Sequence, residues 1–261
     1  MMKYLCSVFV FCLASVSAQA AIKGEEVSYK VNEITMKGYL AYDDAIAAKR
    51  PGVLVVHEWW GHNEYARMRA RKLAEMGYTA LAVDMYGDGK TAANPQEAQA
   101  LATPFYKNPQ LAKTRLDAAQ NKLKTYKQTD ASEMAAIGYC FGGSVVLNSA
   151  RLGADLKGVV CFHGGLTGAP ADKKLLKAKI LVCNGGADKF ISEQDIEAFK
   201  HAMDSIGADY TFKSYANATH AFTNPASTEN GKKFNMPIEY NEAADKASWN
   251  DMQVFLVGVL K

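Results

Sequence analysis

Several features that would point to other classes of protein are missing from this 261-residue sequence. It has no internal repeat, no linker and no low-complexity stretch. The 30 basic and 27 acidic side chains are interspersed, so there is no basic stripe of the kind that binds nucleic acid. Hydrophobic residues make up 49% of the chain, which argues against disorder. The chain is long enough for one large domain with a real core.

The first twenty residues form a segment of their own. Residues 1–4 are a short basic start, residues 5–16 are apolar and uncharged, and Ala18-Gln19-Ala20 has a small-x-small pattern. This pattern is typical of a signal peptide cleaved after Ala20, and the apolar run is too short to span a bilayer. We expect a signal peptide over residues 1–20 and a periplasmic or secreted mature protein without membrane attachment. A buried N-terminal helix is the alternative.

Few cysteines remain beyond residue 20. They are Cys140, Cys161 and Cys183, an odd number that cannot all pair within one chain. An unpaired thiol in an oxidising compartment needs an explanation. Cys161 and Cys183 fall in apolar strand-like runs and are interpreted as buried side chains, although a disulfide between them stays open. Cys140 is therefore the candidate for a functional thiol.

Apolar runs alternate with helical patterns along the chain. Residues 27–42 indicate a hairpin that turns near Asn32, and 217–240 indicate a long loop. The predicted strands are 52–56, 79–83, 134–138, 158–162, 179–183 and 209–215, and the predicted helices are 63–76, two within 95–126, 143–152, 192–206 and 239–260. In the last helix Ala243, Ala247, Phe255 and Val259 are expected to face inward. This alternation predicts an α/β fold with a mainly parallel central sheet and helices on both faces.

The motif with the clearest chemical meaning is Gly138-Tyr139-Cys140-Phe141-Gly142-Gly143. It lies between a predicted strand and a predicted helix, and it matches the nucleophile elbow G-x-S-x-G with cysteine in place of serine. Side chains at Gly138 and Gly142 would collide with neighbouring elements in such a turn. The following helix points its N-terminus at the sulfur, and the N–H of Phe141 can donate to an oxyanion. A glycine-rich turn around a structural cysteine is the alternative.

A base and an acid follow in the order that α/β-hydrolases use. Asp188 comes just after the strand that ends near Cys183, and His220 comes just after the strand that ends near Tyr215. Carboxyl ends of parallel strands form one edge of a sheet, so these side chains should meet Cys140 there. Asp188 could instead cap the next helix, and His220 could be a solvated loop residue. Asp195 and Asp209 are better explained as a helix-cap partner and as a turn residue.

With these residues in place, the chain resembles the dienelactone hydrolase family of α/β-hydrolases. The segments that carry the resemblance are His57-Glu58-Trp59-Trp60-Gly61, Val83-Asp84-Met85-Tyr86-Gly87, the Cys140 elbow, the Asp188 loop and His220-Ala221-Phe222. The resemblance implies a single α/β-hydrolase domain over residues 21–261. It also implies that Glu58 holds the resting thiol until substrate displaces it, and that the N–H of Trp59 is the second oxyanion donor. A helix-capping role for Glu58 is the alternative.

The resemblance also has a departure. Family members that act on dienelactone hold the substrate carboxylate with arginines, and one of these lies four residues beyond the catalytic histidine, where this chain has Asn224. Dienelactone itself is therefore not the expected substrate. Trp60, Tyr86, His163 and Phe222 are expected to wall the pocket. His57 and His62 have the wrong spacing for a zinc helix, so no metal or cofactor is predicted.

Together these residues predict a hydrolase acting on a small ester or lactone. Cys140, His220 and Asp188 would form a triad that works through an acyl-thioester, with Glu58 as a fourth catalytic residue. A different class is a thiol redox or stress-responsive protein that uses Cys140 as an oxidisable switch. A binding protein that kept the pocket is a third possibility. No nucleic-acid partner is expected, and a monomer is the default.

Overall fold

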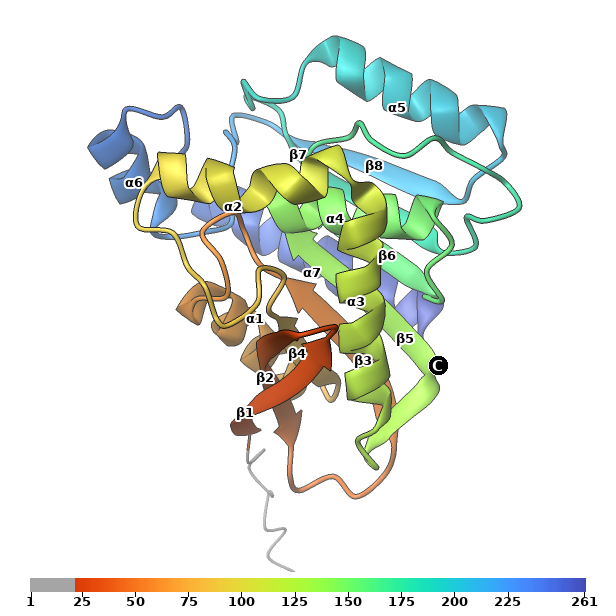
Figure 1. Ribbon diagram of the computed structural model, residues 1–261. Helices are drawn as coiled ribbons and strands as arrows, with labels where there is room; N and C mark the ends of the chain where they lie inside the picture. The colour runs from red at the N-terminus through yellow and green to blue at the C-terminus, as the bar shows by residue number, and fades with distance from the viewer. Residues whose placement is uncertain (1–21) are drawn as a thin grey trace, which may run out of the picture.

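An eight-stranded sheet forms the centre of the protein (Figure 1). The computed structural model describes residues 22–261, so the predicted signal peptide lies outside the described residues. The strands are β1 (Ile22–Val31), β2 (Ile34–Asp43), β3 (Arg50–Val56), β4 (Thr79–Val83), β5 (Thr129–Tyr139), β6 (Gly158–Phe162), β7 (Lys179–Gly185) and β8 (Tyr210–Tyr215). Their order across the sheet is β1-β2-β4-β3-β5-β6-β7-β8.

The sheet is mostly parallel. Strands β1 and β2 form the predicted antiparallel hairpin, and β2 pairs with β4 in antiparallel fashion. Every other neighbouring pair, from β4 through β3 to β8, is parallel. The predicted α/β fold with a mainly parallel sheet is therefore confirmed, and it is an α/β-hydrolase fold.

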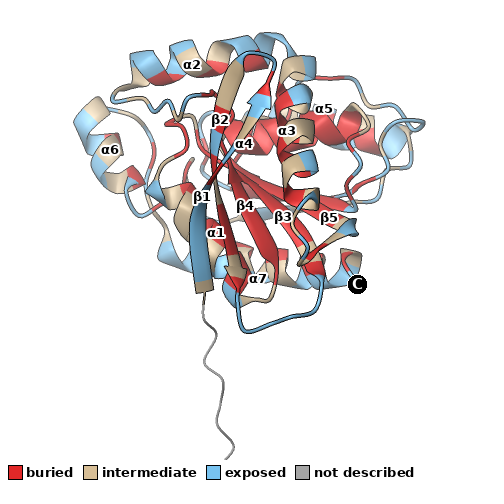
Figure 2. Ribbon diagram, turned by 60° about the horizontal axis from the view of Figure 1, so that its bottom comes forward, coloured by how far each residue is buried: buried red, intermediate tan, exposed pale blue. Residues whose placement is uncertain are grey.

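Helices cover both faces of the sheet, and the central strands are coloured as buried along most of their length (Figure 2). Two clusters of buried side chains form the core, one on each face. The helices are α1 (Glu64–Glu75), α2 (Pro95–Lys107), α3 (Pro109–Lys124), α4 (Phe141–Arg151), α5 (Glu193–Ser205), α6 (Ser227–Phe234) and α7 (Glu242–Val259). Helices α2 to α5 pack with Leu54 and Val56 on one face. Helices α1 and α7 pack with Val53 and Val55 on the other. None of the helices within residues 22–261 has the length and apolar character needed to span a membrane.

Cys161 and Cys183 do not form a disulfide, because successive side chains of a strand point to opposite faces of the sheet. Cys161 lies in the core on the α4 side of the sheet, and Cys183 lies in the core on the α7 side. Cys140, Cys161 and Cys183 are all free thiols. Because the two strand cysteines face opposite layers, a disulfide between them is excluded by geometry.

Two expectations from the sequence were wrong. The segment 217–240 is not a continuous loop, because α6 lies within it. In helix α7, Phe255 and Val259 pack against the core as expected, but Ala243 and Ala247 are exposed, and the buried residues are Ala244, Ser248, Met252 and Leu256. Asp245 is buried with this inner face, because its carboxylate pairs with the guanidinium of Arg69 on α1.

Candidate active site

Cys140 occupies the sharp turn between β5 and α4. Its backbone has φ 51° and ψ −113°, a conformation that costs free energy for any residue other than glycine. A Cβ atom at Gly138 would lie 2.1 Å from the carbonyl oxygen of Gly142. One at Gly142 would lie 2.3 Å from the carbonyl oxygen of Val56 at the end of β3. The predicted need for glycine on both sides of the turn is therefore confirmed.

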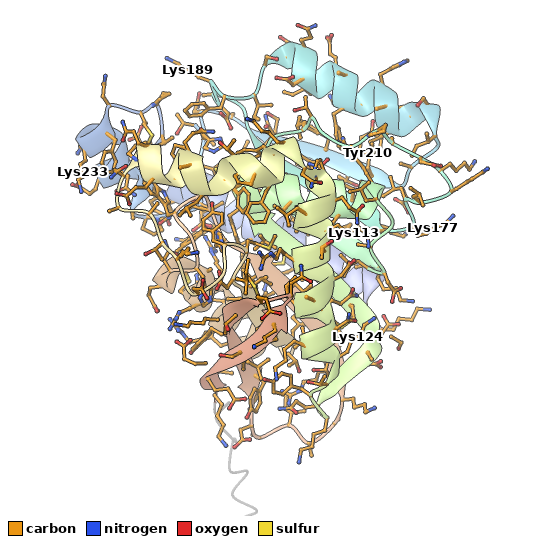
Figure 3. All side chains as sticks on the ribbon, viewed as in Figure 1. Lys113, Lys124, Lys177, Lys189, Tyr210 and Lys233 are labelled. Atoms are coloured by element: carbon orange, nitrogen blue, oxygen red, sulfur yellow. The ribbon has the colours of Figure 1, made fainter. Side chains whose placement is uncertain are left out.

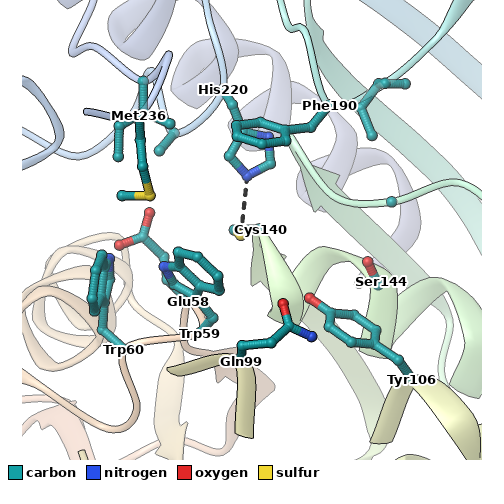
Figure 4. A pocket seen from close by; sticks show the side chains of 14 residues that line it. Glu58, Trp59, Trp60, Gln99, Tyr106, Cys140, Ser144, Phe190, His220 and Met236 are labelled. Carbon is teal, nitrogen blue, oxygen red and sulfur yellow. Dashed lines mark hydrogen bonds between the residues drawn. The ribbon is translucent and has the colours of Figure 1, made fainter. Parts of the chain in front are cut away.

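Three side chains from the ends of three strands are joined by hydrogen bonds. The sulfur of Cys140, after β5, lies 3.0 Å from Nε2 of His220, which follows β8 (Figure 4). Nδ1 of His220 lies 2.8 Å from Oδ2 of Asp188, which follows β7. The other carboxylate oxygen of Asp188 accepts the backbone N–H of Phe190 at 2.8 Å. The structure thus brings the three predicted residues together in the predicted order.

The electrostatics of His220 favour its protonated form. Burial opposes a charge on this ring, but the Cys140 sulfur and the Asp188 carboxylate on its two nitrogens outweigh burial and raise its pKa to about 10. The Asp188 side chain is fully buried, and the His220 side chain is 12% exposed. An imidazolium beside a cysteine sulfur favours the thiolate over the thiol.

Glu58 lies at the end of β3, and its side chain borders the same cavity as Cys140. It is 3% exposed, and its Oε2 accepts a hydrogen bond of 2.6 Å from the amide Nδ2 of Asn224. Burial raises the pKa of Glu58 to about 7, even though the Asn224 hydrogen bond acts in the opposite direction. Helix α1 is capped by Asn63 and not by Glu58.

The expected contact between Glu58 and the resting thiol is not found among residues 22–261. The carboxylate is bonded to Asn224, and the sulfur is bonded to His220. In this state the thiol is already aligned with its predicted base.

The two predicted oxyanion donors border the nucleophile. Phe141 is the first residue of α4, where a backbone N–H has no acceptor within the helix. Trp59 follows Glu58 in the segment after β3, and within the described residues its N–H donates no hydrogen bond. The close approach of Gly142 to the end of β3 holds these two segments side by side.

A cavity of about 280 Å³ opens beside the Cys140 sulfur. Trp59 and Trp60 form part of its wall after β3 (Figure 4). Further lining side chains were not predicted from the sequence: Gln99 and Tyr106 from α2, Ser144 from α4, Phe190 and Ile191 after β7, and Met236 and Ile238 after α6. Apart from Ser144, each of these residues reaches the cavity because segments distant in the sequence pack together, so no local sequence pattern predicts its place there.

Three of the four expected pocket residues lie elsewhere. Trp60 borders the cavity, whereas Tyr86, His163 and Phe222 are buried behind its wall. The hydroxyl of Tyr86 donates to the carbonyl oxygen of Trp59 at 2.9 Å and so supports the wall from behind. Phe222 packs against His163 and Tyr215, with ring centroids 5.2 and 5.6 Å apart.

His163 supports the backbone of the nucleophile. The N–H of Cys140 is shared between the carbonyl oxygen of Phe162 at 3.0 Å and Nδ1 of His163 at 3.1 Å. On the other side of the ring, Nε2 lies 2.8 Å from the hydroxyl of Thr223, which lies 2.6 Å from the hydroxyl of Tyr65. Because Nδ1 accepts a hydrogen bond, the ring proton belongs on Nε2. This arrangement was not foreseen from the sequence.

The histidines beside the tryptophan pair are held in the interior. Burial lowers the pKa of His57 to about 4 and that of His62 to about 3. Nε2 of His57 accepts the N–H of Met85 at 3.3 Å. Among residues 22–261, there is no group of three or more His, Cys, Asp or Glu side chains that could hold a metal ion.

A mostly parallel sheet with a cysteine elbow and a histidine–aspartate pair at its carboxyl edge defines an α/β-hydrolase. Comparison with protein families narrows this class, because the model of the dienelactone hydrolase family matches residues 36–260. The chain belongs to the dienelactone hydrolase family and is a dienelactone hydrolase-like hydrolase.

Solved structures and sequence relatives agree with this assignment. The protein m3DLH is 33% identical, and its solved structure superimposes with a TM-score of 0.87 over 92% of this chain and 100% of the other. A dienelactone hydrolase-like promiscuous phosphotriesterase from metagenomic libraries is 30% identical, with a TM-score of 0.86 over 93% of this chain and 100% of the other. A Methylorubrum extorquens protein, to which carboxymethylenebutenolidase activity has been provisionally ascribed, is 30% identical over 82% of this chain and 79% of that protein.

Proposed function

We propose that this protein hydrolyses a small ester or lactone through a Cys140–His220–Asp188 triad and an acyl-thioester intermediate. The observation that carries the proposal is the continuous line of hydrogen bonds from sulfur to carboxylate, 3.0 and 2.8 Å long, at the wall of a cavity. Membership of the dienelactone hydrolase family supports a small ester or lactone as substrate.

The first step is acylation of the thiol. The Cys140 thiolate adds to the carbonyl carbon of the substrate, and the N–H groups of Phe141 and Trp59 stabilise the oxyanion. When the tetrahedral intermediate collapses, the C–O bond of the ester breaks. The leaving alkoxide takes the proton from Nε2 of His220 and departs as an alcohol. Asp188 keeps the ring oriented and stabilises the imidazolium before this transfer.

The second step is hydrolysis of the thioester. His220, now neutral, takes a proton from water, and the hydroxide formed adds to the thioester carbon. Collapse breaks the C–S bond, which releases the carboxylic acid and restores the thiolate beside the imidazolium. Glu58 borders this reaction space, and a pKa of about 7 lets its carboxyl exchange a proton at neutral pH. We assign Glu58 a supporting acid–base role.

The test is hydrolysis of 4-nitrophenyl acetate by the mature protein and by Cys140→Ala and His220→Ala. Wild type should turn over the ester, both variants should lose at least 99% of kcat/KM, and mass spectrometry of acid-quenched wild type should show one acyl group on Cys140. Cys183→Ala is the matched control, because that thiol is buried in the core between the sheet and α7 and does not border the cavity. Full activity in Cys140→Ala would exclude the mechanism.

A redox switch at Cys140 is the second candidate function. The observation that favours it is that Cys140 is partly exposed while Cys161 and Cys183 are buried. Low doses of peroxide should then oxidise Cys140, and His220→Ala should leave that response intact. Loss of the response in His220→Ala would count against an independent switch.

Export of the mature protein is also proposed, on the basis of residues 1–20 alone. N-terminal sequencing of the protein from a periplasmic or culture fraction should begin at Ala21. A chain that keeps Met1 in the cytoplasm would refute it.

A further inference from the structure

The cavity beside Cys140 has a wall that is poor in positive charge. Among the described residues, no lysine or arginine borders it. Most of the wall is aromatic or aliphatic, and the groups that carry or can carry charge are Glu58, Cys140, His220 and the phenol of Tyr106. Burial raises the pKa of Tyr106 far above neutral, so this phenol stays uncharged.

The cations near this region are directed elsewhere. Arg69 is bonded to the Asp245 carboxylate at 2.5 Å and to the carbonyl oxygen of Thr223 at 2.7 Å. Lys189 and Lys233 adjoin lining segments in the sequence, but both are exposed at the edge of the molecule (Figure 3), and the Lys233 ammonium lies over the ring of Phe234, 4.8 Å from its centroid. The guanidinium of Arg69 and the ammonium groups of the two lysines are therefore not placed to bind an anion in the cavity.

The imidazolium of His220 is not free to bind an anion either. One ring nitrogen is bonded to Cys140 and the other to Asp188. A substrate carboxylate would therefore find both N–H groups of this ring already occupied.

Glu58 adds a negative charge to the wall, and its hydrogen-bonding partner is neutral. The Asn224 amide donates to Glu58 at 2.6 Å without cancelling the charge of the carboxylate. Two like charges in a buried site of low effective dielectric repel each other much more strongly than in water. An anionic group in this cavity would face both the Glu58 carboxylate and the Cys140 thiolate.

We propose that this cavity selects uncharged esters or lactones with aliphatic or aromatic groups, that it rejects substrates carrying a carboxylate near the scissile bond, and that the Asn224–Glu58 pair sets this selection. The proposal rests on the proposed hydrolase function and adds the charge class of its substrate.

The test uses pairs of esters that differ in charge and hardly in shape. One pair is 3-carbamoylphenyl butyrate and 3-carboxyphenyl butyrate, and the other carries the same two groups on the acyl side, as phenyl 3-carbamoylbenzoate and phenyl 3-carboxybenzoate. Each kcat/KM is divided by the rate constant for hydroxide-catalysed hydrolysis of the same ester. At pH 8, where Glu58 is mostly ionised, wild type should prefer the neutral ester at least tenfold in both pairs. An equal or higher value for the carboxylate esters would overturn the proposal.

Asn224 offers a variant that should change the selection. Asn224 also borders a second cavity of about 440 Å³, which gives a longer side chain room to fit. Asn224→Arg should move the neutral-to-anionic ratio at least tenfold toward the carboxylate esters, because a guanidinium would neutralise Glu58. Asn224→Gln keeps a neutral amide and should keep the wild-type ratio. A folded Asn224→Arg protein with an unchanged ratio would refute the role of the pair.

Binding separates this proposal from the hydrolase function. Benzamide should bind wild type at least tenfold more tightly than benzoate in a calorimetric titration at pH 8, whether or not an ester is turned over. Equal binding, or tighter binding of benzoate, would overturn the charge selection even in an active hydrolase. Preferred binding of benzamide by a protein that hydrolyses no ester would refute the hydrolase function and retain the charge selection.

Discussion

The sulfur of Cys140 and Nε2 of His220 lie 3.0 Å apart, within hydrogen-bonding distance. Cys140 and His220 are 80 residues apart in the sequence. Because the Asp188 carboxylate lies on the far nitrogen of the same ring, the imidazolium is stabilised from both sides. This relationship makes the reactivity of the thiol depend on His220.

Alkylation of Cys140 tests that dependence. Without an imidazolium partner, only a few per cent of a cysteine is thiolate at pH 7. His220→Ala should therefore slow the reaction of Cys140 with iodoacetamide at pH 7 by about tenfold or more. Mass spectrometry after limited labelling gives the rate, and the buried Cys161 and Cys183 serve as unreactive internal controls. An unchanged rate would show that His220 does not stabilise the thiolate.

The raised pKa of Glu58 predicts a pH dependence of stability. Between pH 4.5 and 7 the unfolded carboxyl loses its proton while the folded one keeps it, so the free energy of unfolding falls as pH rises through this range. A shift from 4.5 to about 7 corresponds to about 3 kcal/mol once pH exceeds the folded value. Glu58→Gln cannot ionise and should lack this loss. Urea denaturation of both proteins at pH 4.5 and pH 8 measures it, and parallel pH profiles would contradict the shift.

Two glycines should respond to the same substitution in opposite directions. A methyl group at Gly142 would lie 2.3 and 2.7 Å from the carbonyl oxygens of Val56 and His57, and backbone atoms cannot move aside. Gly142→Ala should cost at least about 2 kcal/mol. Gly258 in α7 has no heavy atom within 4 Å of such a methyl group, so Gly258→Ala should raise stability by about 0.5–1 kcal/mol. Thermal unfolding of both variants tests this, and a neutral Gly142→Ala would refute the steric argument.

Thr223 should act as a positioning residue through His163. Its hydroxyl lies 2.8 Å from Nε2 of His163 and 2.6 Å from the Tyr65 hydroxyl. Thr223→Val keeps the shape but leaves the buried Nε2–H of His163 without an acceptor, while the Tyr65 hydroxyl keeps its bond from Arg69; this should cost about 1–3 kcal/mol of stability. It should also lower kcat several-fold with little change in KM, because Thr223 does not border the cavity. Recovery of kcat in Thr223→Ser would support positioning, whereas a change confined to stability would indicate a structural role only.

The central fold could be predicted because its signals are local. Strands buried on both faces are continuous apolar runs, and residues 52–56 follow this rule. The elbow was also recognisable, because its tight turn requires glycine at positions 138 and 142. The predicted role of Asp195 as a helix-cap partner is confirmed for the same local reason, because it forms a capping box with Ser192 at the start of α5.

The remaining elements depend on contacts that the sequence does not display. Helix α6 is polar except for Phe234 at its end, whose ring stacks on that of Trp60. The inner face of α7 includes Asp245, which a hydrophobic pattern assigns to solvent, because Arg69 on a distant helix pairs with it. His163 was assigned to the pocket, and only the structure shows that its ring turns toward the Cys140 backbone.

The strand order has a consequence for the chain while it folds. Strand β3 lies between β4 and β5, and β5 follows it by more than seventy residues in the sequence. Until β5 pairs with it, residues 53–56 leave an open sheet edge, which is a template for pairing with other chains. The strand that covers this edge is also the one that ends at the Cys140 elbow. The pairing of β5 with β3 therefore both covers this edge and places the thiol.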